Sequence, residues 1–370
     1  MNEKSTHPSL SALGMMSGTS LDGIDIAQIT TDGERILDLG PTLTIPYAET
    51  LREHLMSILG QSDNLVVAEN LVTNAHICAV KTFLKATGLS IKNINVIGLH
   101  GQTIMHAPKL HRTIQIGDAQ RLASEFNTNV VADFRSNDVA NGGEGAPLAP
   151  VFHRSLAKNL RHPISIVNIG GVANLSWIHQ ELLMAFDTGP GNALLDDWVF
   201  EKTGKKMDHN GDLASCGSVS KTALQKLMDD PFFKLPAPKS LDRNYFREAS
   251  IAAIAQLNVE DGAATLTSFT SSAIAIASKQ LPQQPHEWLV SGGGRKNRTL
   301  MDCLQKMLAV PVRPVESVGW SGDALEAQLM GFLAVRSLNG FPLSYPLTTG
   351  VPHPMRGGVL FSSANHPIRR

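Results

Sequence analysis

The first 132 residues alternate short apolar runs with apolar residues at helical spacing. Runs typical of strands lie at 11–15, 24–30, 34–39, 94–99, 113–116 and 130–132, and helical patterns lie at 49–59 and 64–87. Short turns join the first three runs, so the pattern predicts a β-meander at the start of the chain. The two helices are expected to cover the sheet that the later strands complete.

A second meander follows a glycine-rich stretch at 141–147, which is a candidate domain boundary or active-site loop. Strands are expected at 164–169, 173–178, 182–186 and 288–290, and helices after Pro190 and at 218–228, 245–257, 261–279 and 323–338. Two βββα units in one chain predict a duplicated α/β fold with a cleft between its halves. Such clefts are usual places for small ligands.

Composition narrows the class of protein. Charged residues make up 18% of the chain and the formal net charge is -1, so no strong field attracts nucleic acid or an anionic membrane. Cys78, Cys216 and Cys303 lie far apart, which favours a reducing compartment and argues against a zinc cluster. No run approaches the roughly 20 apolar residues of a membrane span. We expect a soluble cytoplasmic protein whose partners are small molecules, with no nucleic acid and no membrane.

The loop between the first two strands is rich in glycine and hydroxyl groups. It contains Gly18, Thr19, Ser20, Leu21, Asp22, Gly23, Ile24 and Asp25. Glycine lets backbone N–H groups approach an anion, the hydroxyls add donors, and the two carboxylates can order a metal ion or its waters. The loop is therefore a candidate phosphate clamp. An ordinary hairpin turn uses the same residue types, and that interpretation stays open.

Two further glycine clusters follow strands later in the chain. Gly170 and Gly171 form the first turn of the second meander, and Gly292, Gly293 and Gly294 lie between a strand and a helix that begins near Asn297. The first pair would donate N–H groups to a polyphosphate, and the trio would suit an adenine or ribose that passes against the backbone. Each cluster alone is also explained by a tight turn. Neither a Gly-Lys-Ser/Thr phosphate loop nor a Rossmann glycine motif occurs.

Asp187 ends the third strand of the second meander, just before a helix. A carboxylate at that edge is a candidate general base that accepts a proton from an attacking oxygen. The alternative is that Asp187 binds the free N–H groups at the start of the helix.

Arg135 follows the strand at 130–132 and is a candidate clamp for a carboxylate. The alternative is a salt bridge to Asp133 or Asp138 that anchors the domain junction. His100, in the run 99–103, ends another strand with polar groups suited to a sugar, although a lone histidine is more often structural.

Glu326 lies on the first turn of the last long helix, three residues after Asp323. This spacing is that of a capping box, so both residues are candidate helix caps. The small residues Ala324, Ala327 and Gly331 predict close contact of this helix with its neighbours.

Taken together, these segments resemble the anhydro-N-acetylmuramic acid kinases, a family of the acetate and sugar kinase, Hsp70 and actin superfamily. The resemblance covers nearly the whole chain and rests on the motifs at 14–25, 100–103, 132–135, 142–148, 168–174, 186–192, 238–240, 291–297 and 322–327. It implies a two-lobed actin-like, ribonuclease H-like ATPase fold, built of duplicated βββαβα units around a central cleft. Each lobe would hold a five-stranded mixed sheet, with the first lobe at 1–130 plus 345–370 and the second at 131–344.

The resemblance also implies the chemistry. The segment 18–25 would bind the ATP phosphates, Asp187 would be the catalytic base, and Arg135 and Glu326 would bind or orient the sugar, with Mg²⁺ expected but its ligands unassigned. Water would attack C1 of 1,6-anhydro-N-acetylmuramic acid while O6 takes the γ-phosphoryl group, giving N-acetylmuramate 6-phosphate and ADP for cell-wall recycling. A homodimer stays open. The alternatives are another sugar kinase or a polyphosphatase of the superfamily, or an actin-like or chaperone-like ATPase that serves a protein partner.

Overall fold

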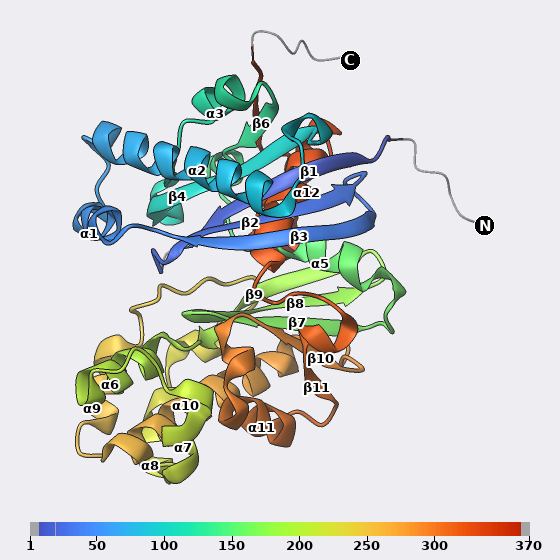
Figure 1. Cartoon of the computed structure of the whole chain (residues 1–370). Helices are drawn as coiled ribbons and strands as arrows, with labels where there is room; N and C mark the ends of the chain where they lie inside the picture. Colours follow the sequence, from blue (N-terminus) through green and yellow to red (C-terminus); the bar gives the residue numbers. More distant parts are fainter. Residues whose placement is uncertain (1–6, 19, 364–370) are drawn as a thin grey trace. The chain divides into compact units, whose positions relative to one another are not determined.

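The structure is a computed structural model that describes residues 7–18 and 20–363 (Figure 1). Its contacts divide the chain into two compact units. Unit 1 comprises Met1–Leu156 with Ala324–Arg370, and unit 2 comprises Ala157–Asp323. The segments 131–156 and 324–344 thus lie in unit 1, whereas the lobes expected from the sequence assigned them to the second lobe.

Unit 1 contains one mixed sheet and the helices that flank it. Its strands are β1 (Leu10–Ser17), β2 (Gly23–Thr31), β3 (Ile36–Pro46), β4 (Val96–Ala107), β5 (Arg112–Ile116), β6 (Asn129–Ala132) and β12 (Val359–Phe361). Its helices are α1 (Glu49–Ile58), α2 (Val66–Thr87), α3 (Ala119–Phe126), α4 (Ser136–Ala140), α5 (Pro150–Leu156), α12 (Leu325–Leu338) and α13 (Pro346–Thr349).

The strand order in this sheet is β12-β6-β4-β1-β2-β3, and β5 pairs with β4. The described residues therefore form seven strands here, where five were expected. The difference arises because β12 adds an antiparallel strand beside β6, and because β4 continues past its pairing with β6 to pair with β5. The expected meander is present as β1, β2 and β3, which are antiparallel neighbours.

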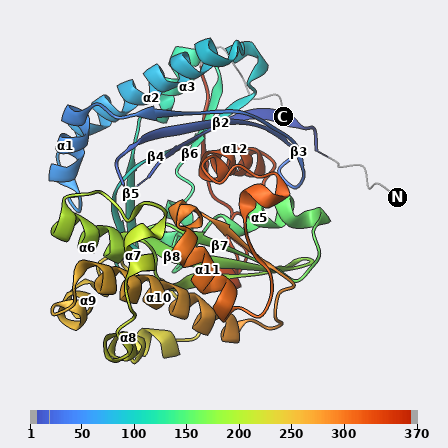
Figure 2. The ribbon, with the colours of Figure 1, turned by 60° about the horizontal axis from the view of Figure 1, so that its bottom comes forward.

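Alternation along β1 decides which helices cover each face of the sheet. Leu13 and Met15 point into a core shared with α1, α2 and α3. On the other face, a Cβ on Gly14 would overlap the Ala327 carbonyl oxygen of α12, and a Cβ on Gly331 would lie 2.7 Å from Ile29 Cγ2. The close helix contact expected from the small residues is confirmed. Figures 1 and 2 show α2 and α12 on opposite faces of the sheet.

Unit 2 contains the second sheet. Its strands are β7 (Ile164–Ile169), β8 (Val172–His179), β9 (Leu182–Pro190), β10 (Trp288–Ser291) and β11 (Val312–Pro314). Its helices are α6 (Ala193–Thr203), α7 (Asp212–Cys216), α8 (Lys221–Met228), α9 (Arg247–Ile254), α10 (Val259–Ala277) and α11 (Arg298–Met307), and short 3-10 helices include η5 (Pro231–Lys234) and η7 (Gly293–Lys296).

The order of these five strands, β11-β10-β7-β8-β9, repeats the order β6-β4-β1-β2-β3 of unit 1. In both units the meander strands are antiparallel and the next two strands are parallel to the first. The expected duplication is therefore present in the topology. One core packs α10 and α11 on the sheet around Trp177 and Trp288, and a second core joins α6 through α10 around Phe233 and Phe269.

Several boundaries differ from the expected ones. β9 extends to Pro190 rather than ending at Phe186, because it stays paired with β8 through a register shift at Ala173 and Asn174.

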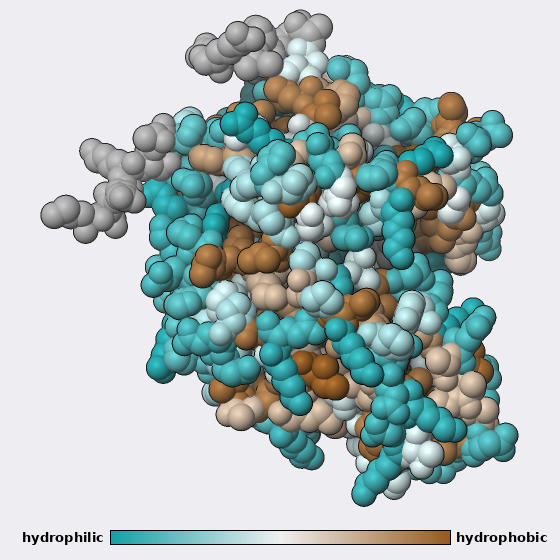
Figure 3. Space-filling model, turned by 180° about the vertical axis from the view of Figure 1, so that it is seen from behind, coloured by the Kyte–Doolittle hydropathy of each residue, from teal (hydrophilic) through white to brown (hydrophobic). Residues whose placement is uncertain are grey.

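No helix of the described residues is long and apolar enough to cross a membrane. On the face drawn in Figure 3, apolar residues lie in small groups among hydrophilic ones.

Candidate active-site residues in each unit

The predicted phosphate loop is a tight turn between β1 and β2 in unit 1. The Leu21 N–H donates to the Gly18 carbonyl at 3.2 Å, and Leu21 has a positive φ of 58°. Gln102 holds the same carbonyl through its Nε2 at 3.1 Å. Ser20 is exposed, and Thr19 lies outside the described residues. Hydrogen bonds to the Gly18 carbonyl therefore hold the backbone of the turn in place, and Ser20 with its hydroxyl is exposed.

The rest of this loop divides into buried and accessible side chains. Leu21 and Ile24 are buried in the core, so only their backbone groups remain for a ligand. Asp22 is exposed, and Asp25 accepts a hydrogen bond from Thr44 Oγ1 at 2.5 Å. Gly23 lies against β3, where a Cβ would overlap the Ile45 carbonyl.

Arg135 is held in place by neutral groups. Its Nε and Nη2 donate to His100 Nε2 at 3.2 and 3.0 Å, and its Nη1 donates to the Gly145 carbonyl at 2.7 Å. The expected alternative named Asp133 or Asp138 as its partner. Asp138 instead accepts from Gly145 N at 2.6 Å and from Thr349 Oγ1 at 2.6 Å, and also from Ser344 Oγ. Asp138 thus fixes the glycine-rich loop whose carbonyl fixes Arg135.

The tautomer of His100 follows from its contacts. Its Nδ1 lies 2.7 Å from the Gly101 carbonyl, which only accepts, so Nδ1 carries the hydrogen and Nε2 accepts from Arg135. Burial, followed by the Arg135 charge, lowers the pKa of His100 to about 3. His100 is therefore a neutral acceptor, which the sequence could not distinguish from an ordinary structural histidine.

Glu326 lies close enough to Arg135 and Asp25 to interact with both charges. Desolvation of its carboxylate is the largest effect and raises its pKa. The positive charge of Arg135 opposes this rise, and the negative charge of Asp25 adds to it. The residue nonetheless keeps solvent-exposed surface. The structure thus brings Asp25, Arg135 and Glu326 together in unit 1.

The helix-cap interpretation of Asp323 and Glu326 is wrong. The N-cap residue of α12 is Ala324, which makes no side-chain capping bond. Asp323 instead pairs with Arg295 at 2.9 Å and with Lys296 at 2.8 Å. Opposite charge, rather than the start of the helix, positions this carboxylate.

In unit 2 the two glycine clusters lie together. A Cβ on Gly292 would overlap Asn168 Oδ1, and a Cβ on Gly294 would lie 2.5 Å from Ile169 Cγ2. The N–H of Gly170 donates to the Val172 carbonyl at 3.2 Å, while the Gly170 carbonyl accepts from Asn192 N at 2.7 Å. The Gly170 N–H is therefore already used within its own turn.

Asn297 begins α11. Its side chain accepts from Leu300 N at 2.9 Å and is buried. The structure therefore gives this residue the role of a helix cap next to the glycine trio.

Asp187 lies within β9 and is held by a loop 54 residues away. Its N–H donates to the Lys239 carbonyl at 2.9 Å, and its Oδ2 accepts from Leu241 N at 2.8 Å. The N-cap residue of α6 is Asn192, which makes no side-chain capping bond. These contacts favour a positioned carboxylate over the helix-cap alternative. The same loop reaches the first glycine turn, since Arg243 Cδ lies 3.6 Å from the place of a Cβ on Gly171.

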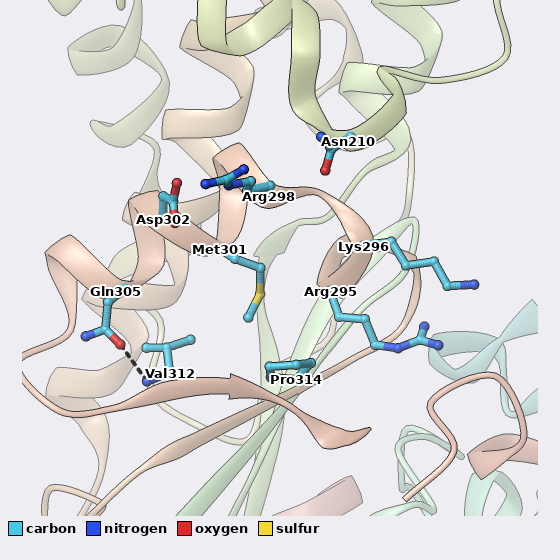
Figure 4. Close-up of a pocket in the computed structure, with 9 residues that line it drawn as sticks. All are labelled: Asn210, Arg295, Lys296, Arg298, Met301, Asp302, Gln305, Val312 and Pro314. Atoms are coloured by element: carbon cyan, nitrogen blue, oxygen red, sulfur yellow. Dashed lines mark hydrogen bonds between the residues drawn. The ribbon is translucent and has the colours of Figure 1, made fainter. Parts of the chain in front are cut away.

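A cavity of about 440 Å³ lies beside the glycine trio in unit 2 (Figure 4). Its lining combines charged and polar side chains with three apolar ones: Asn210, Arg295, Lys296, Arg298, Met301, Asp302, Gln305, Val312 and Pro314. Arg295 is fixed by Glu316 at 2.7 Å as well as by Asp323. The cavity therefore combines apolar surface with charged side chains, of which Arg295 and Lys296 are already paired with carboxylates.

Asp196, on the first turn of α6, is a group that the sequence analysis did not single out. Burial raises its pKa to about 7, and Asp197 and Asp208 add to the shift while Arg243 opposes it.

In the described part of the chain, no group of three or more His, Cys, Asp or Glu side chains is arranged to hold a metal ion.

Known proteins resemble this chain over nearly its whole length. A family model described as anhydro-N-acetylmuramic acid kinase matches residues 11–363. The chain is 50% identical over 348 residues to the anhydro-N-acetylmuramic acid kinase of Paramagnetospirillum magneticum, which covers 94% of this chain and 98% of that protein. It is 51% identical to the protein of that name from Acidiphilium cryptum, with 94% and 97% covered. The activator of the 2-hydroxyisocaproyl-CoA dehydratase from Clostridium difficile with bound ADPNP is a similar solved structure, with a TM-score of 0.47, 12% identity, and 90% of this chain and 97% of that chain covered.

Proposed function

The chain belongs to the anhydro-N-acetylmuramic acid kinase family, and from this premise we propose that it opens the anhydro ring of 1,6-anhydro-N-acetylmuramic acid and phosphorylates O6 at the expense of ATP. The observation that carries the proposal is the family match over residues 11–363, together with about 50% identity to two relatives over nearly their whole length. The products are N-acetylmuramate 6-phosphate and ADP, which places the enzyme in cell-wall recycling.

The reaction joins a hydrolysis to a phosphoryl transfer. Water attacks C1, the bond between C1 and O6 breaks, and the γ-phosphoryl group passes from ATP to O6. The water loses one proton in this step. A carboxylate that accepts it and is held at a fixed position serves as the general base.

Asp187 is proposed as that base. The hydrogen bond from Leu241 N fixes Oδ2, and the hydrogen bond from Asp187 N to the Lys239 carbonyl fixes the backbone. A preorganised carboxylate pays little reorganisation cost when the proton is transferred. This geometry supports the assignment.

Two loops are proposed to bind the ATP phosphates. In unit 1 the segment 18–25 would supply backbone N–H groups with the hydroxyls of Thr19 and Ser20. In unit 2 the turn at Gly170 and Gly171 would contribute, and Gly171 is the better donor because the Gly170 N–H already binds Val172. Anionic phosphate favours such backbone donors.

The adenosine part of ATP is proposed to bind at Gly292, Gly293 and Gly294, beside the cavity of Figure 4. Met301 and Val312 would contact the flat apolar faces of a purine, and Arg298 is an exposed cation at the rim. Asn297 would act through the N-terminus of α11, which its side chain caps.

Arg135 and Glu326 are proposed to bind and orient the sugar. The guanidinium is a planar donor suited to the lactyl carboxylate of the substrate. Glu326, within the field of Arg135, would accept a hydrogen bond from the sugar.

Magnesium is proposed to arrive with the nucleotide. Because Mg²⁺ is usually held by one or two carboxylates and the substrate phosphates, a dedicated cluster of three side chains is not needed. Asp22, exposed on the phosphate loop, and Asp25 fit that donor set. When bound, the ion neutralises charge on the phosphates.

The test measures ADP release by the purified protein with the anhydro-sugar, with glucose, and with neither, in water enriched in ¹⁸O. The expected result is ADP formation that depends on the anhydro-sugar, with a sugar phosphate whose phosphoryl group carries no ¹⁸O. A polyphosphatase or a partner-dependent ATPase would instead release labelled inorganic phosphate without the sugar. Equal ADP formation with glucose alone would contradict the proposal in favour of an ordinary sugar kinase.

A further inference from the structure

Lys239 is a buried cation in unit 2 to which the proposed chemistry gives no task. Its side chain is 9% exposed, and burial lowers the pKa of its ammonium group. Burying an ammonium group is costly unless other groups replace its lost hydration. The contacts of Lys239 therefore indicate what the buried charge does.

The ammonium group is held by backbone and aromatic rings. Its Nζ donates to the Phe232 carbonyl at 3.0 Å and lies 4.5 Å from the centre of the Phe232 ring. It also lies 5.9 Å from the centre of the Phe186 ring. Cations are attracted to the faces of aromatic rings, most strongly where water is excluded.

These anchors belong to the packed cores of the unit. Phe232 lies in η5, whose N-cap residue Asp230 accepts from Phe232 N at 2.8 Å. The Phe232 ring packs edge-on against Phe233 and Phe246 in the helical core. Phe186 directly precedes Asp187 on β9 and is fully buried.

The backbone of the same lysine reaches Asp187. β9 is the last strand of its sheet, so its outer edge has no neighbouring strand among the described residues. The Lys239 carbonyl accepts from Asp187 N, and two residues later Leu241 N donates to Asp187 Oδ2. The loop thus takes the place of a neighbouring strand and orients the carboxylate.

We infer that Lys239 is a positioning residue, whose side chain anchors the 239–241 loop on Phe232 and Phe186 so that Leu241 N–H holds the carboxylate of Asp187 in place. Lys239 acts through the loop and touches no reacting atom. The inference rests on the proposed function, because it assumes that Asp187 is the base.

The experiment replaces Lys239 with methionine, which retains the length of an unbranched side chain and removes the charge and the donor. Lys234→Met is the matched control, since Lys234 is an exposed lysine in η5. We expect kcat to fall by roughly tenfold in K239M, the size of effect of one lost positioning hydrogen bond. The KM for ATP should stay at the wild-type value, and K234M should match the wild type in both constants.

Hydrogen exchange of the 240–242 amides, followed by mass spectrometry, gives a second measurement that does not depend on activity. We expect faster exchange in K239M and wild-type exchange in K234M. If K239M does not fold, Lys239→Gln, which keeps a neutral donor for the Phe232 carbonyl, is measured with the same two expectations.

The outcomes separate this inference from the proposed function. Wild-type kcat and wild-type exchange in a folded Lys239 variant would overturn the inference, whatever Asp187 does. Turnover retained by Asp187→Asn would overturn the assignment of Asp187 as the general base. The exchange rate of the 240–242 amides in K239M would still decide whether Lys239 anchors the loop. A fall in kcat without faster exchange would also contradict the inference.

Discussion

His100 accepts two hydrogen bonds from the guanidinium of Arg135 on a single ring nitrogen, Nε2, at 3.2 Å from Nε and 3.0 Å from Nη2. The ring cannot accept them if it is protonated, and burial beside the Arg135 charge keeps it neutral by lowering its pKa to about 3. This pairing occupies one edge of the guanidinium and fixes its plane. The Nη1 group is fixed in turn by the Gly145 carbonyl.

Replacing His100 with leucine should weaken binding of the anhydro-sugar through Arg135. Because the hydrogen bonds involve a charged donor, we expect the KM for the sugar to rise roughly tenfold or more, while the KM for ATP stays unchanged. Steady-state kinetics with each substrate varied in turn measures both. His100→Gln, which supplies a carbonyl acceptor, should recover part of the loss. An unchanged KM for the sugar in H100L would contradict the positioning of Arg135.

Asp187→Asn should remove proton transfer while preserving the shape of the side chain. The amide oxygen can still accept from Leu241 N, so the loop should keep its place. We expect kcat to fall by about 10²–10⁴, the range for loss of a general base. Calorimetry should give a wild-type Kd for ATP. Near-normal turnover in this variant would show that another group takes the proton.

Local sequence patterns were sufficient to locate most elements. The run predicted at 164–169 is β7 to the residue, and those predicted at 11–15 and 24–30 are longer by one or two residues at each end as β1 and β2. These segments alternate or are continuously apolar, so the period of each is set within the segment itself. The end of β9 was missed because its last residues are held by pairing with β8, which no local pattern records.

The contacts that orient candidate site residues could not be predicted. His100 and Arg135 are 35 residues apart, and Asp187 and Leu241 are 54 apart. Sequence motifs marked Arg135 and Asp187 as polar residues that follow or end strands, but the partners of both depend on the tertiary fold. Asp323 was misassigned for the same reason, since its spacing fits a helix cap while its charge is paired with Arg295 and Lys296.

Gly14→Ala tests the packing of α12 on β1, and it should strongly destabilise the protein. A Cβ at Gly14 would overlap the Ala327 carbonyl, and a backbone atom cannot move aside as a flexible side chain can. We expect the free energy of unfolding to fall by about 3 kcal/mol, at the upper end of overpacking effects. Urea denaturation measures the change. A variant as stable as the wild type would contradict the assignment of α12 to the core of unit 1.

Asp196 should make the stability of the protein depend on pH. In an unfolded chain an aspartate has a pKa of about 3.9, whereas burial, with Asp197 and Asp208 nearby, raises that of Asp196 to about 7 despite Arg243. Between these two values the folded protein holds a proton that the unfolded chain has lost. The stabilising contribution is therefore complete below about pH 4 and is lost as the pH rises through about 7.

Asp196→Asn removes this titration, because the amide stays neutral at every pH. The variant should gain stability relative to the wild type as the pH is raised from 5 to 8.5, and urea denaturation at each pH measures the difference. Asp229→Asn is the control, since Asp229 is exposed and an amide oxygen can keep its hydrogen bond from Gln225. Its stability should run parallel to the wild type across the range. If the curve of D196N runs parallel as well, the raised pKa of Asp196 is wrong, and the field of Arg243 keeps that carboxylate charged in the folded protein.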